Sequence, residues 1–201
     1  MTRKAMWIAV MALGCTAIGQ APMQAQMGGM KMDAPAVGTP ADPAKEIDGM
    51  LRLFESEFTG AAKAMPGDKY DFAPKTAMIP GSKYDGVRTF AQQITHVIQA
   101  NYSFYSRVGG MKPDVDMKAI DAMTKKDEIV AALAASFAFA HKSIATITAA
   151  NAFVTIKGAD GMNTRASLAT FGVAHGYDHY GQVVEYLRMN GIIPPASAGG
   201  M

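Results

Sequence analysis

The chain has 201 residues, of which 19 are basic, 17 are acidic and 49% are hydrophobic, enough for one domain with a hydrophobic core. Two of the basic residues, Arg3 and Lys4, lie in an N-terminal leader without acidic residues, so the rest of the chain holds 17 of each sign. A neutral chain gives no electrostatic basis for binding nucleic acid, and we expect no nucleic-acid partner.

Residues 1–25 are predicted to be a secretory signal peptide. Their basic start is followed by an apolar run over about residues 5–19, the order typical of such signals. The run is shorter than the roughly 20 residues that a permanent membrane helix needs. We therefore expect a periplasmic or secreted protein with no membrane span after signal removal.

The single cysteine, Cys15, lies inside this leader. Leu13-Gly14-Cys15 partly resembles a lipoprotein acylation motif, but Ala12 stands where leucine is usual, so we expect signal cleavage rather than a lipid anchor. The mature chain then contains no cysteine. Disulfides and thiolate ligands are excluded for it, and any metal would depend on histidine, carboxylate or water.

Residues 26–42 form a lead rich in Met, Gly, Ala and Pro that shows no helical pattern. This composition predicts a flexible segment. The methionines in and just before it would also suit Cu(I), an alternative that we rank below a flexible tether; they are Met23, Met27, Met30 and Met32.

The first two helices are predicted from apolar residues at helical spacing. Asp42-Pro43 can begin the first, because an N-cap residue is followed by proline at the first helical position, and Pro66-Gly67 ends it. The second is predicted over about residues 85–108. His96 lies within it but off the centre of its apolar stripe, so the period alone predicts a surface or boundary position.

A third helix is predicted to run to about residue 151. Thr124 followed by Asp127 resembles a capping box at its start. His141 lies at the edge of the apolar stripe of this helix, and we interpret it as structural. Residues 153–163 are predicted to be a connecting loop, since they show no convincing strand pattern.

The fourth helix, residues 164–191, carries the most informative pattern. His175 and His179 lie one turn apart, near the middle of its apolar stripe. Two imidazoles at this spacing can bind one metal ion, although a hydrogen-bonded pair of core histidines is the alternative. The glutamate of the HExxH motif of zinc proteases is absent, because Gly176 and Tyr177 stand between the histidines.

Four helices of about 20 to 27 residues predict an all-α four-helix bundle. We expect the bundle to cover residues 43–195 and a short tail to cover residues 196–201. Bundles build metal sites from side chains on facing helices, which suits histidines on two of them.

Three tracts of the chain together resemble the DinB-like superfamily, which includes the DinB and YfiT-type proteins. The tracts are DKYDFAP before the second helix, TFAQQITHVIQANYSFY in the second and AHGYDHYGQVVEYLRMNGIIPP in the fourth. The resemblance covers residues 44–195. It implies a bundle with a three-histidine metal site formed by His96, His175 and His179, whereas His141 matches no ligand of the family.

The resemblance further implies a divalent metal, such as Zn, Ni, Mn or Fe, with positions open to water or substrate. It implies a metal-dependent hydrolase or thiol-type transferase acting on a small molecule. A metal-binding bundle protein without turnover, serving in stress or metal handling, is the alternative, because no nucleophile or clear base accompanies the histidines.

No catalytic residue is assigned from the sequence. Asp178, Gln182 and Glu185 lie within one or two turns of the histidines and are candidates to orient an imidazole or to act as a base. The oligomeric state stays open, with a homodimer among the alternatives.

Overall fold

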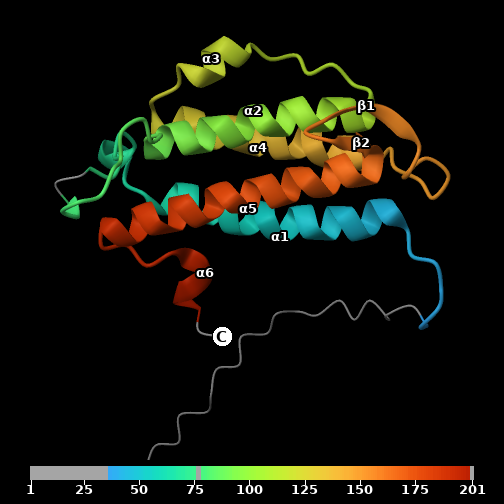
Figure 1. Cartoon of the computed structure of the whole chain (residues 1–201), viewed down its shortest axis with the longest axis horizontal. Helices are drawn as coiled ribbons and strands as arrows, with labels where there is room; N and C mark the ends of the chain where they lie inside the picture. The colour runs from blue at the N-terminus through green and yellow to red at the C-terminus, as the bar shows by residue number, and fades with distance from the viewer. Residues whose placement is uncertain (1–35, 76–77, 200–201) are drawn as a thin grey trace, which may run out of the picture. The chain divides into compact units, whose positions relative to one another are not determined.

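Four long helices form the bundle: α1 (Pro43–Ala64), α2 (Phe90–Gly109), α4 (Lys126–Ile144) and α5 (Arg165–Met189) (Figure 1). The computed structural model describes residues 36–75 and 78–199. The predicted signal peptide, Cys15 and the methionines of the lead lie outside these ranges. The predicted all-α bundle is confirmed, in a unit that begins at Gly38. Within the described ranges, no helix combines the length and apolarity that a membrane span requires.

The helices do not follow a simple up-and-down order. Each of α1 and α2 packs against both α4 and α5. α1 and α5 run in one direction, and α2 and α4 run in the other (Figure 1). Consecutive helices therefore lie at opposite corners in two cases, α1 with α2 and α4 with α5, which requires long connections. The antiparallel α2–α5 pair carries the site described below.

The connections and the chain end carry shorter elements: η1 (Gly67–Lys69), α3 (Met117–Asp121), β1 (Thr155–Ala159), β2 (Met162–Thr164) and α6 (Pro195–Ala198). α6 packs against α1. A Cβ placed on Gly60 of α1 would lie 3.6 Å from the ring of Pro195, so the predicted tail begins with a helical turn held against the bundle.

The start of α2 is set by a capping box. The hydroxyl of Thr89 accepts a hydrogen bond from the backbone N–H of Gln92, and the side chain of Gln92 accepts one from the N–H of Thr89. This reciprocal pair satisfies two donors that the helix itself cannot satisfy. The helix consequently begins at Phe90, about one turn later than the predicted residue 85, and Arg88 directly precedes the cap.

α4 differs from its prediction at both ends. The predicted capping box at Thr124 is wrong, because the helix begins after Lys125, whose side chain makes no capping bond. The helix also ends at Ile144 and does not extend to residue 151. The side chain of Asn151 bonds two backbone groups of the following turn at 2.8 and 3.0 Å, which replaces the bonds that would continue the helix.

The predicted loop before α5 is also wrong, because it contains the antiparallel hairpin β1–β2. Asp160 and Gly161 join the strands with φ angles of 50° and 82°. Positive φ at both positions is what a type I′ two-residue turn requires, and Asp-Gly is a strong sequence signal for it. β2 spans only three residues, too few for an alternating pattern to be recognised.

Glycines let α5 approach its neighbours closely. A Cβ placed on Gly176 would lie 2.3 Å from the ring of Phe54 in α1, and one on Gly172 would lie 2.8 Å from the hydroxyl of Tyr105 in α2. Neither distance is sterically allowed, so the approach depends on the missing side chains. The adjoining face of α5, which carries the two histidines, is thereby brought against α2.

Candidate metal centre

Three histidines converge where α2 and α5 pack together. His96 comes from α2, and His175 and His179 come from α5. One ring nitrogen of each lies within 4.8 Å of those of the other two, and this is the only such group of histidine, cysteine or acidic residues within the described ranges. The ring centroids lie 4.6 to 5.3 Å apart. The arrangement is compatible with one metal ion bound between the two helices.

The cluster lies at the boundary of the core. His179 is buried, with 4% of its surface exposed, whereas His96 and His175 are half-buried. The boundary position predicted for His96 is therefore confirmed. The side chain of His96 can act as a ligand from this position without pointing into the core. The central position predicted for His175 is wrong. The buried face of α5 is centred on Gly172 and Gly176, and Gly176, which lacks a side chain, does not stand out in an apolar pattern.

A chain of hydrogen bonds holds the ring of His179. Its Nδ1 lies 2.8 Å from Oε1 of Gln93, and Nε2 of Gln93 donates to Oε1 of Gln182 at 2.7 Å. Nε2 of Gln182 in turn donates to Oδ2 of Asp178 at 3.3 Å. The carboxylate can only accept, so it sets the direction of the whole chain. His179 therefore donates from Nδ1, which leaves the lone pair on Nε2 for a ligand.

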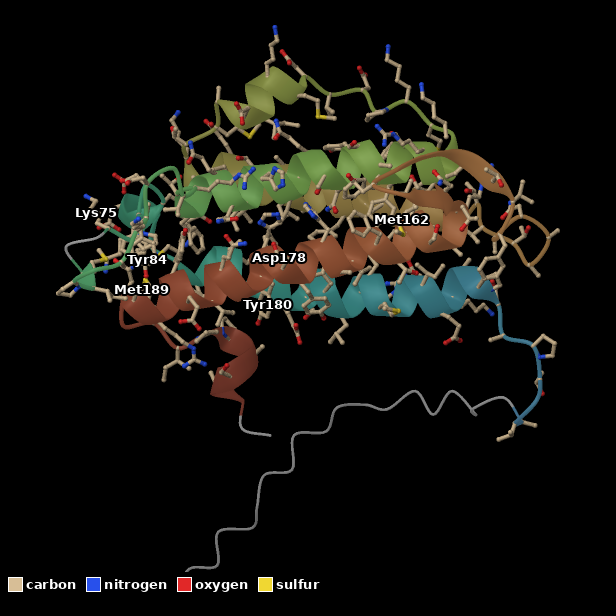
Figure 2. The ribbon with its side chains drawn as sticks, viewed as in Figure 1. Lys75, Tyr84, Met162, Asp178, Tyr180 and Met189 are labelled. Carbon is tan, nitrogen blue, oxygen red and sulfur yellow. The ribbon has the colours of Figure 1, made fainter. Side chains whose placement is uncertain are left out.

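Gln93 is the functional residue that sequence reasoning missed. It is 1% exposed, although helical periodicity places it off the apolar stripe of α2. Of the three candidates to orient an imidazole, Asp178 and Gln182 reach His179 through Gln93. Figure 2 labels Asp178 midway along α5, where α2 passes beside it. Glu185 is exposed, and its carboxylate makes no hydrogen bond within the part of the chain that the structure describes.

His175 provides the strongest structural support for a ligand-binding role of the cluster. Its Nε2 is buried and has no hydrogen-bond partner among the described residues. A buried polar atom without a partner costs about 1–3 kcal/mol, and such atoms are rare in native structures. The rings of Phe104 and Phe171 pack against this imidazole, with centroids 5.5 and 6.0 Å away, and neither can satisfy the nitrogen.

The surroundings keep the three rings neutral. Burial, together with His175 and His96 acting as like charges, lowers the pKa of His179 to about 4. Burial is also the main cause of the lowered pKa of His96, followed by the charge of Arg88. Burial lowers the pKa of His175, although Asp178 and Asp160 oppose the shift. Neutral imidazole is the form that binds a metal ion.

A polar hollow of about 440 Å³ adjoins the cluster on the side of His96. We name it the Arg88 hollow; its lining residues are Gly86, Arg88, Gln92, His96, Gln99 and Asp121. Of the three histidines, His96 is the one that lines it. Phe104 and Phe171, which pack against His175, do not line the hollow.

His141 lies outside the cluster, at the packing seam between α1 and α4. Its Nδ1 is 2.5 Å from Oδ1 of Asp48, and its Nε2 is 3.0 Å from Oε2 of Glu55. Both ring nitrogens are therefore occupied by side chains of α1. This contact agrees with the structural interpretation of His141.

A family model described as the DinB superfamily matches residues 50–183. The match covers more than half of the chain, from within α1 to within α5, and includes His96, His175 and His179. The chain belongs to the DinB superfamily, as its resemblance predicted. No curated protein and no solved structure matches it.

Proposed function

We propose that His96, His175 and His179 bind one divalent metal ion, with one nitrogen from each ring. The observation that carries the proposal is the buried Nε2 of His175, which has no protein partner among the described residues. Hydrogen-bonded core histidines would explain the cluster only if their nitrogens were satisfied. A bound cation would offset both the unsatisfied nitrogen and the burial of three polar rings.

The chain positions its ligand atoms before any metal arrives. Gln93 holds His179 in the tautomer that presents Nε2, and a neighbour in this role raises ligand basicity and fixes the ring. Phe104 and Phe171 restrict the freedom of His175. A divalent ion held by these three neutral nitrogens would supply Lewis-acid chemistry. Zn, Ni, Mn and Fe are all compatible with nitrogen ligands.

We further propose that the protein is a metal-dependent enzyme, a hydrolase or a transferase, that acts on a small molecule. Two observations support turnover over simple metal storage. The chain offers three ligands to the ion, which leaves coordination positions for substrate. The Arg88 hollow, large enough for a small molecule, opens beside His96.

Export is part of the proposal and rests on the sequence of residues 1–25. Outside the cytoplasm small thiol cofactors are scarce, so hydrolysis is favoured over thiol transfer. N-terminal sequencing of the native protein tests export. We expect a start between Gln20 and Met27, and a cytosolic protein that retains Met1 would contradict it.

The deciding experiment combines metal analysis with a substrate panel. Protein purified from its native compartment should contain about one equivalent of a divalent metal, and His179→Ala protein should contain almost none. Hydrolysis should stop with a chelator and return when the metal is restored. Helix content by circular dichroism should be unchanged in the variant, since the apolar faces of the helices do not depend on the metal. Hydrolysis that survives both the chelator and the His179→Ala substitution would exclude the metal mechanism.

A further inference from the structure

The Arg88 hollow has a lining that is not explained by metal binding. Apart from Gly86, every residue around it is polar, and two are charged, Arg88 and Asp121. Its volume of about 440 Å³ falls in the range of pockets that bind small molecules. A polar hollow of this size beside three histidines is suited to the part of a ligand that does not react.

One of the residues lining the hollow, Arg88, is an exposed cation. The side chain of Arg88 has no carboxylate within ion-pair distance in the described part of the chain. Its backbone is anchored, because its carbonyl accepts a hydrogen bond from the hydroxyl of Tyr186 in α5 at 3.0 Å and Thr89 caps α2 next to it. Arg88 and His96 line the same hollow, so the guanidinium lies on the side of the cluster that a small molecule can enter.

The two glutamines that line the hollow, Gln92 and Gln99, differ in which of their hydrogen-bond groups already have partners. Oε1 of Gln92 accepts the N–H of Thr89 at 2.9 Å, which leaves its NH₂ group as the part of that amide without a partner among the described residues. Nε2 of Gln99 already donates to the carbonyl of Met117. Arg88 and Gln92 together therefore form a donor side of the hollow, and Asp121 is its one anionic acceptor.

We propose that the Arg88 hollow binds an anionic group, a carboxylate or a phosphate, of the small molecule handled at the histidine site. A guanidinium presents paired N–H groups that match the oxygens of either anion. The inference rests on the proposed function only in placing the reacting end of the ligand at the histidines. Asp121 repels a second anionic group and favours a hydroxyl or ammonium group on the same molecule.

The test uses two probes, inorganic phosphate and succinate, titrated by calorimetry at constant ionic strength. Each is measured on the metal-loaded protein and on the chelated protein. In the chelated protein the anion cannot bind directly to a metal ion, so any binding there is due to the protein alone. The probe that binds more tightly to the chelated protein identifies the anion class.

Arg88→Gln should weaken binding of that probe at least about tenfold in both forms, the loss expected for a charged hydrogen bond. Arg52→Gln is the matched control, since Arg52 is an exposed arginine of α1 that pairs with Asp48. The affinity of the Arg52→Gln protein for the same probe should equal that of the wild type. Asp121→Asn should strengthen binding by removing a repulsive charge. Equal affinities in wild type and Arg88→Gln, or an equal loss in Arg52→Gln, would overturn the inference.

The same titrations separate this inference from the metal proposal. A protein that takes up no metal but binds the anion through Arg88 would contradict only the metal site. A protein that binds metal yet shows no Arg88-dependent binding of either probe would contradict only the anion site.

Discussion

Two helix seams of this bundle hold histidines, and their surroundings differ. At the α1–α4 seam, both nitrogens of His141 contact carboxylate oxygens of Asp48 and Glu55. At the α2–α5 seam, the described residues offer the three rings one amide, from Gln93, and Nε2 of His175 has no partner. A ring that is satisfied by a neighbouring helix ties two helices together, whereas an unsatisfied ring is available to a ligand.

Removing one ring from each seam should give the largest contrast. His175→Ala should lower the affinity for Zn²⁺ more than about 100-fold, because losing a ligand costs more than losing a group that orients one. His141→Ala should leave the affinity unchanged. Competition with a chromophoric chelator measures both variants, and equal losses would reject the distinction between the seams.

Removing a supporting group should give the next largest effect. Gln93→Leu should weaken metal binding about 10- to 100-fold, because His179 loses the partner that sets its tautomer. Asp48→Asn, which changes the partner of His141 at the other seam, is the matched control and should have no effect. If Gln93→Leu binds metal like the wild type, the hydrogen-bond chain has no role at the site.

In the absence of metal, the substitution at the α1–α4 seam should cost more stability than the one at the α2–α5 seam, the reverse of their effects on metal affinity. In the presence of a chelator, His141→Ala should lower the free energy of unfolding by about 1–3 kcal/mol, since two bonds to partly exposed carboxylates are lost. His175→Ala should cost less, because the penalty of its unsatisfied nitrogen disappears with the ring. Urea unfolding monitored by circular dichroism decides the order, and a larger cost for His175→Ala would contradict it.

Acidification should reveal the smallest difference. The folded-state pKa of His179, about 4, lies below the ordinary value near 6.5. Between these values the unfolded chain binds more protons than the folded one, so stability falls as the pH drops through this window. His179→Gln should reduce the slope of unfolding free energy against pH in chelated protein. An unchanged slope would show that His179 is not held neutral by the fold.

Sequence reasoning succeeded where neighbouring residues carry the information. The spacing of His175 and His179 places both rings on one side of a helix whatever packs against it. Asp42 caps α1 as predicted, with Oδ1 3.0 Å from the N–H of Ala44. His96 is a different case. Its ligand role was predicted from the resemblance to a family, whereas the helical period of α2 correctly predicted its position at the boundary of the core.

The errors have a common origin in contacts that the local pattern does not contain. The buried face of α5 was misplaced because Gly176 contributes no apolar side chain to the pattern, although it lies against the ring of Phe54. The end of α4 was misplaced because the side chain of Asn151 satisfies backbone groups that helical periodicity cannot show. The hairpin has a local turn signal, Asp160-Gly161, but the strands on either side are too short to show an alternating apolar pattern.

The sequence by itself determined the four long helices, the apolar side of most of them and the histidine pair on one side of α5. These features depend on residues within a turn or two of each other, where helical geometry alone relates them. Only the tertiary structure decided that His96 meets that pair and that Gln93 holds His179. The bonded residues Gln93 and His179 are 86 positions apart. Their meeting depends on how closely α5 can approach α2, which the absence of a side chain at Gly172 allows.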